Sequence, residues 1–410
     1  MNLTSKFPTL SLHEDTNLDF AFLIFMTELR VALFTGNYNH IRDGVSLTLN
    51  RLVYYLESQN IPVLVFGPSN KNPAIDHCGE LVVTPSIPML VPGREEYRIA
   101  THLSKKAKKR LEEFKPTLIH IATPDGLGIG ALRWAKKHNI PKVTSYHTHF
   151  LSYTEYYSLY LSPIKKPFKM MMKWFYKQFA HTYVPSKSMI EELNREGIPG
   201  NMKIWARGID TERFNPSKRD MEWRRSVGFA DDDIVVTFVS RLVWEKELRT
   251  FIDSVKRLQT SNPKVRALVV GNGQAEEEAK QLLPSAHFTG FAKGEELARA
   301  YASSDIFMFP SHTETFGNVT LEAMASGLPC IVADAIGSKS LVDDGINGFL
   351  AKKESVDDFT HQLEKIVLDS EKRIEMGKKS REMAMGYQWD SINSGLVENY
   401  LEVLHNSEKY

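Results

Sequence analysis

The stretch HTETFGNVTLEAMASGLPCIVADA, residues 312–335, decides the fold because a strand, a loop and a helix follow one another around it. The apolar run DIFMFPS before it predicts a buried strand that ends near Ser311. A helix follows the loop, and Gly327 and the proline two positions later end that helix. The loop is therefore expected at the carboxyl end of a strand, where open α/β sheets bind ligands.

Two glutamates, Glu314 and Glu322, lie on either side of the predicted start of this helix. Free backbone amides and the helix dipole at such a start favour an anion such as a diphosphate. The amides concerned belong to Phe316, Gly317, Asn318 and Val319. Glu314 is then expected to face the group attached to the phosphate, and Glu322 to accept hydrogen bonds from ribose hydroxyls. An arbitrary pair of glutamates is most often solvated surface, but the buried strand before this pair favours a site.

These residues resemble the signature of glycosyltransferase family 4 (group 1), whose members are retaining nucleotide-sugar glycosyltransferases with the GT-B fold. The matching parts are the two glutamates, the Phe-Gly-Asn-Val run and the Ala-Ser-Gly-Leu-Pro run. The resemblance implies that Glu314 faces the donor sugar, that Glu322 holds the ribose and that the amides between them hold the diphosphate. The sequence looks like the branch that contains glycolipid and sulfolipid synthases and related mannosyl- and glucosyltransferases.

Length and composition set bounds on the kind of protein. A chain of 410 residues is long enough for two domains of roughly 200 residues each. Its 42% hydrophobic and 25% charged residues are ordinary for a globular protein, and a net charge of +1 gives no field that favours nucleic acid. Cys78 and Cys330 lie far apart, which argues against a disulfide framework and fits a reducing cytoplasm.

Strands and helices alternate in both halves, which predicts an α/β protein with two Rossmann-like, doubly wound parallel sheets facing across a cleft. We expect residues 26–207 to bind the acceptor and residues 208–390 to bind the nucleotide sugar. Residues 391–410 are expected to form a helix that crosses back to the first domain, as in GT-B proteins. Residues 1–25 read as a poorly ordered extension whose apolar run, FAFLIFM, is too short to span a bilayer.

The first half offers several candidates for the site. RDGVS carries Gly44 between a strand and a helix, where a plain turn is the simpler interpretation, although the family has a glycine-containing loop there. His147 and His149 follow the strand KVTSY, and a histidine at this place in the family contacts the donor sugar. His147 matches that histidine best, which leaves His149, with Asp125 at a neighbouring strand end, as a candidate for binding the acceptor.

The second half offers a pair of cations. Arg241 and Lys246 follow the strand DIVVTFVS, and together they could neutralise a departing diphosphate. On spacing alone a surface Arg and Lys is more common, but the loop matches the family's Arg-Leu-x-x-x-Lys motif. Glu247 departs from that motif, because many members have glycine there. Gly273 at the next strand end and Phe291, which the family places near the base, complete the predicted donor site.

Two basic segments stand out from the balanced composition. RIATHLSKKAKKRLEEF, residues 98–114, predicts one helix with a solvated basic face. A glycine-rich turn is expected at residues 125–130, before the next helix. Residues 153–177 interleave aromatics and methionines with five lysines and almost no acids, as in segments that lie at a lipid headgroup surface. A core helix whose lysines face water explains that second segment equally well.

Together these observations predict a retaining hexosyltransferase that uses a UDP- or GDP-sugar and a membrane glycolipid or other cell-envelope acceptor. No Asp-x-Asp motif stands at a strand end, so neither a metal nor another cofactor is expected. The enzyme is expected in the cytoplasm, with possible peripheral contact to the inner face of the membrane. Two alternatives are a catalytically silent protein that binds nucleotide sugar or membrane as a partner subunit, and a nucleotide-sugar epimerase of similar fold.

Overall fold

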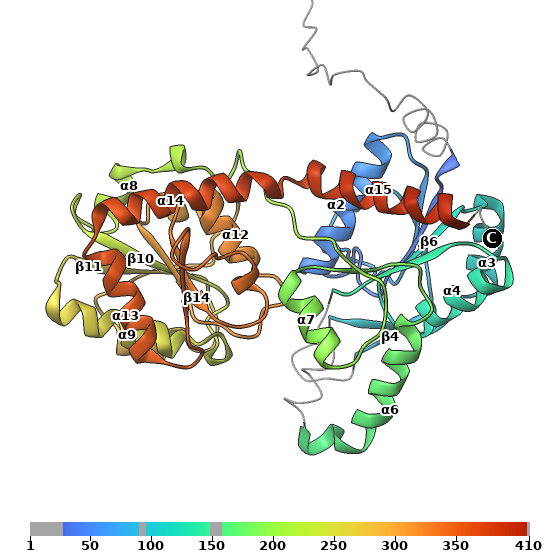
Figure 1. Cartoon of the computed structure of the whole chain (residues 1–410), viewed down its shortest axis with the longest axis horizontal. Helices are drawn as coiled ribbons and strands as arrows, with labels where there is room; N and C mark the ends of the chain where they lie inside the picture. The colour runs from blue at the N-terminus through green and yellow to red at the C-terminus, as the bar shows by residue number, and fades with distance from the viewer. Residues whose placement is uncertain (1–27, 90–95, 148–157, 408–410) are drawn as a thin grey trace, which may run out of the picture. The chain divides into compact units, whose positions relative to one another are not determined.

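The computed structural model describes residues 28–89, 96–147 and 158–407 (Figure 1). The expectation of a poorly ordered extension at residues 1–25 lies outside them. The chain forms two compact units: one contains the residues up to Val143 and those from Val397 onward, and the other is Thr144–Leu396. The predicted domain boundary after residue 207 lies within this second unit, between the last strand of one sheet and the first strand of the next.

The first sheet has seven strands in the order β3-β2-β1-β6-β7-β8-β9. Its pairs β1/β2, β1/β6, β2/β3, β7/β8 and β8/β9 are parallel. Every residue of β1, β2 and β6 is buried, as expected for a parallel sheet covered on both faces. The strands are β1 (Val31–Phe34), β2 (Val63–Gly67), β3 (Glu80–Val83), β6 (Leu118–Ile121), β7 (Lys142–Ser145), β8 (Thr182–Val184) and β9 (Met202–Ile204).

The helices that connect these strands follow the expected alternation. They are α2 (Gly44–Ser58), α3 (Lys105–Phe114), α4 (Gly126–Lys137), α6 (Ser158–Tyr176) and α7 (Lys187–Arg195). Four of them begin at a side chain that accepts a hydrogen bond from the backbone of the first turn: Asp43, Ser104, Asp125 and Ser186.

Two local predictions for this region are wrong. Residues 98–114 do not form one helix, because Arg98–Ala100 form β5 and pair antiparallel with β4 (Ser86–Pro88) before α3 starts. The glycine-rich turn expected at residues 125–130 belongs to the first turns of α4, which begins at Gly126. Its glycines allow close packing: a Cβ on Gly126 would lie 1.9 Å from the carbonyl oxygen of Thr101.

The second sheet has six parallel strands in the order β12-β11-β10-β13-β14-β15. Its core is continuous from β10 to α13, and in it the Phe238 ring contacts both Phe251 and Phe309. The strands are β10 (Ile234–Val239), β11 (Val265–Val270), β12 (His287–Gly290), β13 (Ile306–Phe309), β14 (Cys330–Ala333) and β15 (Gly348–Ala351). The two parallel α/β sheets confirm the predicted fold class.

The helices around the second sheet include a short one that carries a buried arginine. They are α8 (Met221–Ser226), α9 (Leu248–Ser261), α10 (Glu276–Leu282), α11 (Gly294–Ala302), α12 (Asn318–Ala325), α13 (Val356–Val367), α14 (Ser370–Ala384) and α15 (Trp389–Ser407). The residues of α15 are divided between the two units. In the part of the chain that the structure describes, no helix is both long enough and apolar enough to cross a lipid bilayer.

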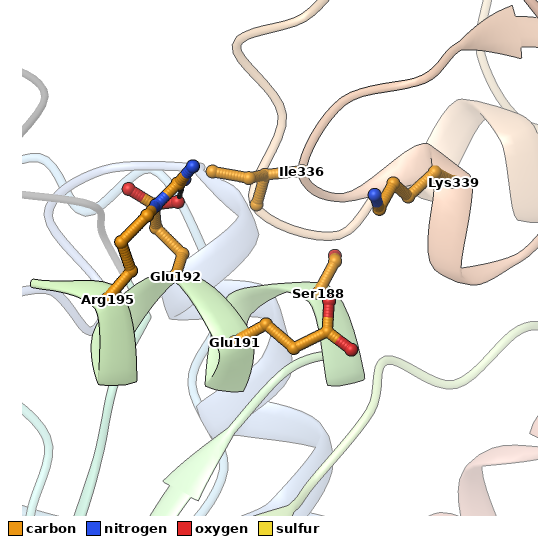
Figure 2. A pocket seen from close by; sticks show the side chains of 6 residues that line it. All are labelled: Ser188, Glu191, Glu192, Arg195, Ile336 and Lys339. Carbon is orange, nitrogen blue, oxygen red and sulfur yellow. Dashed lines mark ion pairs between the residues drawn. The ribbon is translucent and has the colours of Figure 1, made fainter.

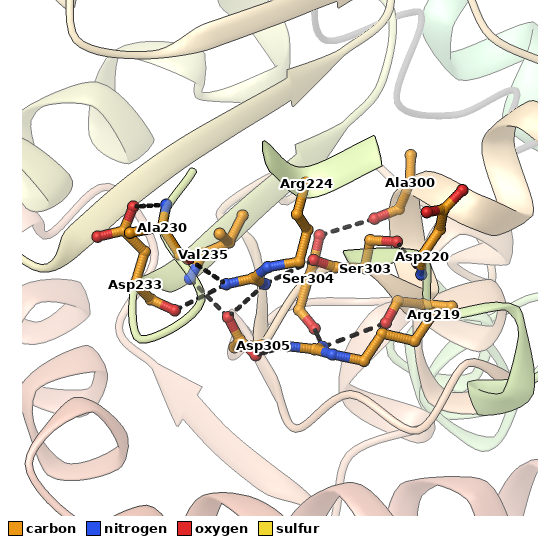
Figure 3. A network of polar contacts seen from close by, with 11 residues as sticks. Arg219, Asp220, Arg224, Ala230, Asp233, Val235, Ala300, Ser303, Ser304 and Asp305 are labelled. Carbon is orange, nitrogen blue, oxygen red and sulfur yellow. Dashed lines mark hydrogen bonds and ion pairs between the residues drawn. The ribbon is translucent and has the colours of Figure 1, made fainter. Parts of the chain in front are cut away.

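Arg224 in α8 is fully buried and joins the segments that lead into β10 and β13 (Figure 3). Its guanidinium donates to the Ser303 carbonyl at 2.7 Å and pairs with Asp305 at 3.0 Å. The same Asp305 oxygen accepts from the Val235 amide at 2.8 Å, and the other oxygen pairs with Arg219 at 2.8 Å. The carboxylate thereby fixes where β10 and β13 begin.

We expect Asp305→Ala to destabilise the protein by about 3–5 kcal/mol, because the buried Arg224 guanidinium loses its counter-charge. Urea unfolding followed by circular dichroism measures the change. Asp231→Ala is the matched control, because Asp231 pairs with Arg225 on the exposed surface and should change the unfolding midpoint little. Equal midpoints for wild type and Asp305→Ala would contradict the proposed role of the buried pair.

Candidate active site

The loop after β13 leads into α12 through a backbone conformation that requires glycine. Gly317 has φ 97° and ψ 55°, in the left-handed region. A Cβ at this position would lie 2.5 Å from the Ser338 hydroxyl oxygen, so no other residue fits without displacing that serine. The amides of Thr320 and Leu321 donate to the Gly317 carbonyl, which begins the helical ladder. For the amides of residues 316–319, the described chain provides no acceptor, so they can receive an anion.

Lys246 and Glu314 come together beside this loop. The Lys246 ammonium lies 2.6 Å from a Glu314 carboxylate oxygen and 3.0 Å from the Thr313 hydroxyl. Their side chains are 13% and 24% exposed, so the pair is screened by solvent less than a surface pair is. The sequence predicted both residues for the site but gave no sign that they touch. The structure thus places a partly buried cation and an acceptor at the predicted anion seat.

The loop that carries Lys246 is held by two glycines after β11. Gly271 and Gly273 have φ 132° and 159°, and a Cβ on either would lie within 2.3 Å of a carbonyl oxygen of Ser240 or Leu242. The Leu242 amide donates to Asn272, and its carbonyl accepts from Ala275. Gly273 therefore has a packing role, while its predicted contact with the donor stays a prediction.

Other predicted donor residues lie open to solvent. The Arg241 side chain is 67% exposed and pairs with Glu245 at 3.3 Å, on its own loop. Phe291 is 68% exposed, between β12 and α11. Both are accessible to a ligand, but no contact within the described residues joins either to Lys246 or Glu314.

Glu322 lies on the first turns of α12, and burial raises the pKa of its carboxyl to about 7. The Tyr301 hydroxyl donates to it at 3.0 Å, which lowers the pKa but does not outweigh the burial. A second Glu322 oxygen remains for a ligand hydroxyl. Sequence reasoning identified Glu322 but not Tyr301, which is fully buried in α11.

His147 follows β7 and is buried, at 7% exposed. Its Nε2 lies 2.7 Å from the Ser145 hydroxyl, and its Nδ1 lies 2.9 Å from the Arg207 guanidinium. A guanidinium only donates hydrogen bonds, so Nδ1 is the acceptor and the proton of the neutral ring is on Nε2. The Trp205 ring packs edge-on against His147 at 5.5 Å. Arg207 and Trp205 were not predicted for the site.

The remaining candidates of the first half have structural partners. Asp125 caps α4 by accepting from the Gly128 amide at 2.8 Å, and burial raises the pKa of its carboxyl to about 6. Its other oxygen would lie 3.0 Å from a Cβ on Gly36, at the end of β1. Gly44 opens α2 directly after Asp43, whose carboxylate already accepts from the Ser46 amide. His149 lies outside the described residues.

A small polar pocket separates α7 from the turn at residues 336–340 (Figure 2). The Ser188 hydroxyl accepts from the Gly337 amide at 3.1 Å, and the Ser340 hydroxyl donates to it at 2.8 Å. The pocket carries charges of both signs, which gives it no preference for a phosphate. It is lined by Ser188, Glu191, Glu192, Arg195, Ile336 and Lys339.

One further group of titratable side chains lies near the loop of Glu314. Glu247, His312 and Glu354 each offer one possible ligand atom for a metal ion, and these atoms all lie within 4.8 Å of one another. Sequence reasoning did not bring these residues together, because they come from three separate segments.

Comparison with known proteins identifies the family. Residues 42–213 match the family model "Glycosyltransferase Family 4", and residues 220–383 match "Glycosyl transferases group 1". A sulfoquinovosyl transferase from Arabidopsis thaliana is 30% identical over 88% of this chain and 71% of its own length. The chain belongs to glycosyltransferase family 4. It is accordingly a retaining hexosyltransferase that uses a nucleotide-sugar donor, as the sequence predicted.

Two further relatives of this family 4 enzyme act on different substrates. A GDP-mannose-dependent alpha-mannosyltransferase from Corynebacterium glutamicum is 29% identical over 93% of this chain and 91% of its own. An alpha-monoglucosyldiacylglycerol synthase from Acholeplasma laidlawii is 26% identical over 79% of this chain and 85% of its own. A solved sucrose-phosphate synthase from Thermosynechococcus elongatus has a TM-score of 0.74 at 19% identity and covers 92% of this chain and 100% of its own, which confirms the GT-B fold.

The raised pKa of Glu322 predicts a pH-dependent stability. The pKa of about 7 in the folded enzyme exceeds the ordinary value of 4.5, so the folded state holds a proton that the unfolded state releases. This carboxyl therefore lowers stability as the pH rises through that interval. We expect Glu322→Gln to gain stability over wild type between pH 5 and pH 8, by about 2–3 kcal/mol at the upper end.

Urea unfolding at pH 5, 6, 7 and 8 measures this gain. Glu296→Gln is the matched control, because Glu296 is exposed on α11 and should show the same difference from wild type at every pH. A gain for Glu322→Gln that does not change with pH would show that the carboxyl is not protonated in the folded enzyme near neutral pH.

Proposed function

We propose that this enzyme transfers a hexose from a UDP- or GDP-sugar to a hydroxyl of a membrane glycolipid or other cell-envelope acceptor. The observation that carries the proposal is the Lys246–Glu314 pair beside the unpaired amides of residues 316–319. The printed activities of the relatives, which include a diacylglycerol glycolipid synthase and a GDP-mannose-dependent enzyme, support the choice of substrates.

The donor diphosphate is assigned to the start of α12. The amides of residues 316–319 and the Lys246 ammonium would receive its oxygens, and the exposed Arg241 could fold over them. When the bond to the sugar breaks, negative charge grows on the diphosphate, and these fixed donors stabilise that charge more than they stabilise the intact donor. Glu314, released from Lys246, would accept hydrogen bonds from the sugar hydroxyls.

The nucleoside is assigned to the neighbouring elements. Glu322 retains one carboxylate oxygen for the ribose hydroxyls, because Tyr301 donates to the other. Phe291 offers an exposed ring for contact with the base. Gly273 has no side chain, so the donor could approach the backbone closely at the end of β11. We assign this donor site to residues 208–390.

The reacting carbon of the sugar is assigned to the neighbourhood of His147. A neutral imidazole held by Arg207 and Ser145 has a fixed ring orientation, which suits contact with one sugar hydroxyl. The acceptor is assigned to residues 26–207. There Asp125, with a pKa of about 6, could accept a hydrogen bond from the acceptor hydroxyl. Gly44 and His149 stay candidates for the same domain.

The acceptor assignment receives support from α6. Met172, Phe175 and Tyr176 are buried on one side of this helix, which is the pattern of a helix that packs on a core. On the other side Met170 and Trp174 are 63% and 45% exposed, although both are large and apolar. Exposed lysines lie at helical spacing around them, which matches a face that contacts an anionic lipid surface: Lys166, Lys173 and Lys177. Lys169 instead pairs with Glu196.

The catalytic proposal predicts that Lys246→Ala abolishes measurable transfer, which means that the rate of sugar transfer falls by about 100-fold or more. The reason is that the variant lacks the fixed cation beside the leaving diphosphate. A thermal-shift screen against UDP- and GDP-sugars first selects the donor. Release of nucleoside diphosphate in the presence of membrane lipids then measures turnover. Lys256→Ala, an exposed lysine of α9, is the matched control and should keep wild-type activity. A Lys246→Ala enzyme with more than a tenth of the wild-type rate would refute the assignment.

The membrane proposal predicts that the combined change Lys166→Ala, Lys173→Ala and Lys177→Ala weakens binding to anionic vesicles. Each lysine near such a surface contributes ~1 kcal/mol, so three together predict about a 100-fold loss at low salt. Vesicle sedimentation measures the loss. The control replaces three exposed lysines of α3, Lys105, Lys106 and Lys109, and should bind as wild type does. Equal losses in both variants would show that net charge, and not the α6 face, drives binding.

A further inference from the structure

Two carboxylates lie close to the His312 ring, and one oxygen of each lies within 4.8 Å of the other. Glu247 joins the short turn at Trp244–Lys246 to α9, His312 follows β13, and Glu354 lies between β15 and α13. The His312 Nδ1 is 3.9 Å from a Glu247 oxygen, and its Nε2 is 3.7 Å from a Glu354 oxygen. Three segments that are distant in the sequence thus each contribute one side chain of the kind that binds transition metals.

These separations are too long for hydrogen bonds, which end near 3.2 Å. Two ligands that share one Zn²⁺ at ~2.1 Å in tetrahedral geometry are separated by roughly 3.4 Å. One ion can bind only one nitrogen of the ring, and at Nδ1 the nearest Glu247 oxygen is 3.9 Å away. One possible ligand atom of each of the three side chains lies within 4.8 Å of the other two, so side-chain movements of roughly 1 Å would bring all three to one ion. The three groups are farther apart than hydrogen-bonded partners and close enough to share one ion after a small rearrangement.

The His312 ring supplies a second, separate observation. Its Nδ1 is enclosed and has no hydrogen-bond partner within the described residues, although the ring as a whole is 28% exposed. An enclosed nitrogen without a partner is unfavourable, by about 1–3 kcal/mol for a typical polar group. A metal ion bound at this nitrogen would remove that penalty and would also neutralise the charge of the two carboxylates.

We propose that Glu247, His312 and Glu354 form a binding site for a divalent transition-metal ion, with Zn²⁺ as the ion whose ligand preferences fit best. One imidazole and two carboxylates suit Zn²⁺ better than Mg²⁺ or Ca²⁺, which prefer oxygen ligands alone. Three protein ligands leave a further coordination position for water or another small ligand.

The site lies next to the Lys246–Glu314 pair along the chain. Glu247 directly follows Lys246, and His312 precedes Thr313 and Glu314, both of which contact Lys246. A bound ion ties together the two loops that carry this pair and adds the turn that contains Glu354. The ion stabilises these loops and takes no part in bond breaking, so the proposal is compatible with metal-independent transfer. It does not depend on the donor or acceptor assigned above.

The test uses the full chain without a histidine tag at pH 7.5. Isothermal titration with ZnCl₂ is expected to show one equivalent bound, and the midpoint of thermal unfolding should rise by about 5 °C or more at saturating Zn²⁺. MgCl₂ and CaCl₂ at the same concentration should leave the midpoint unchanged. A wild-type midpoint that Zn²⁺ does not raise would overturn the proposal.

Three variants identify the ligands. His312→Gln and Glu354→Gln should each weaken Zn²⁺ binding at least tenfold, while His361→Ala, an exposed histidine of α13, should bind as wild type does. Glu247→Gly should also lose the Zn²⁺ response, yet its unfolding midpoint without metal should not fall. Glu247 has φ 57°, which glycine adopts freely, so lost metal binding is separated from lost folding. Unchanged Zn²⁺ affinity in the His312 and Glu354 variants would place the ion elsewhere and refute the site.

Discussion

The close packing of Gly317 on Ser338 is the constraint on which the site depends. A residue without a side chain lets the loop after β13 turn directly into α12 in a left-handed conformation. Ser338 is itself held by Thr320 at 3.0 Å, and Gly337 packs against the carbonyl of Glu314. Sterics at two glycines therefore set the position of the carboxylate that pairs with Lys246.

A second constraint acts at the amino ends of two strands of the second sheet. The buried Arg224–Asp305 pair fixes the first residues of β10 and β13, the two neighbouring strands whose carboxyl ends lead to Lys246 and Glu314. Because the strands are parallel and hydrogen-bonded in register, an anchor at one end determines where the loops leave at the other. The charge network lies before the first residues of β10 and β13, and through these strands it influences the spacing of Lys246 and Glu314.

Much of this arrangement could be predicted from the sequence, because buried parallel strands give uninterrupted apolar runs such as DIFMFP and turn signals follow them. The helix predicted at residues 98–114 was wrong since the pairing of Arg98–Ala100 with β4 is a tertiary contact that local pattern does not show. Likewise the glycines at 126–130 suggest a turn in the sequence but lie in α4, where they allow close packing against neighbouring segments that local pattern does not show.

The candidate site residues divide in the same way. Glu314, Glu322 and Lys246 could be proposed from the sequence because they lie in local motifs. Arg207 beside His147, and His312 between two glutamates, depend on contacts between separate segments, for which a single sequence gives no spacing rule.

The Lys246–Glu314 contact also has a consequence for which anions can enter. With both groups already neutralised by each other at 2.6 Å, an incoming ligand must compete with a carboxylate that is permanently attached and hence always at high local concentration. A singly charged ion would gain less from this exchange than a group with several negative oxygens. If such a group leaves, the pair would form again, and Glu314 would compete with the group for Lys246.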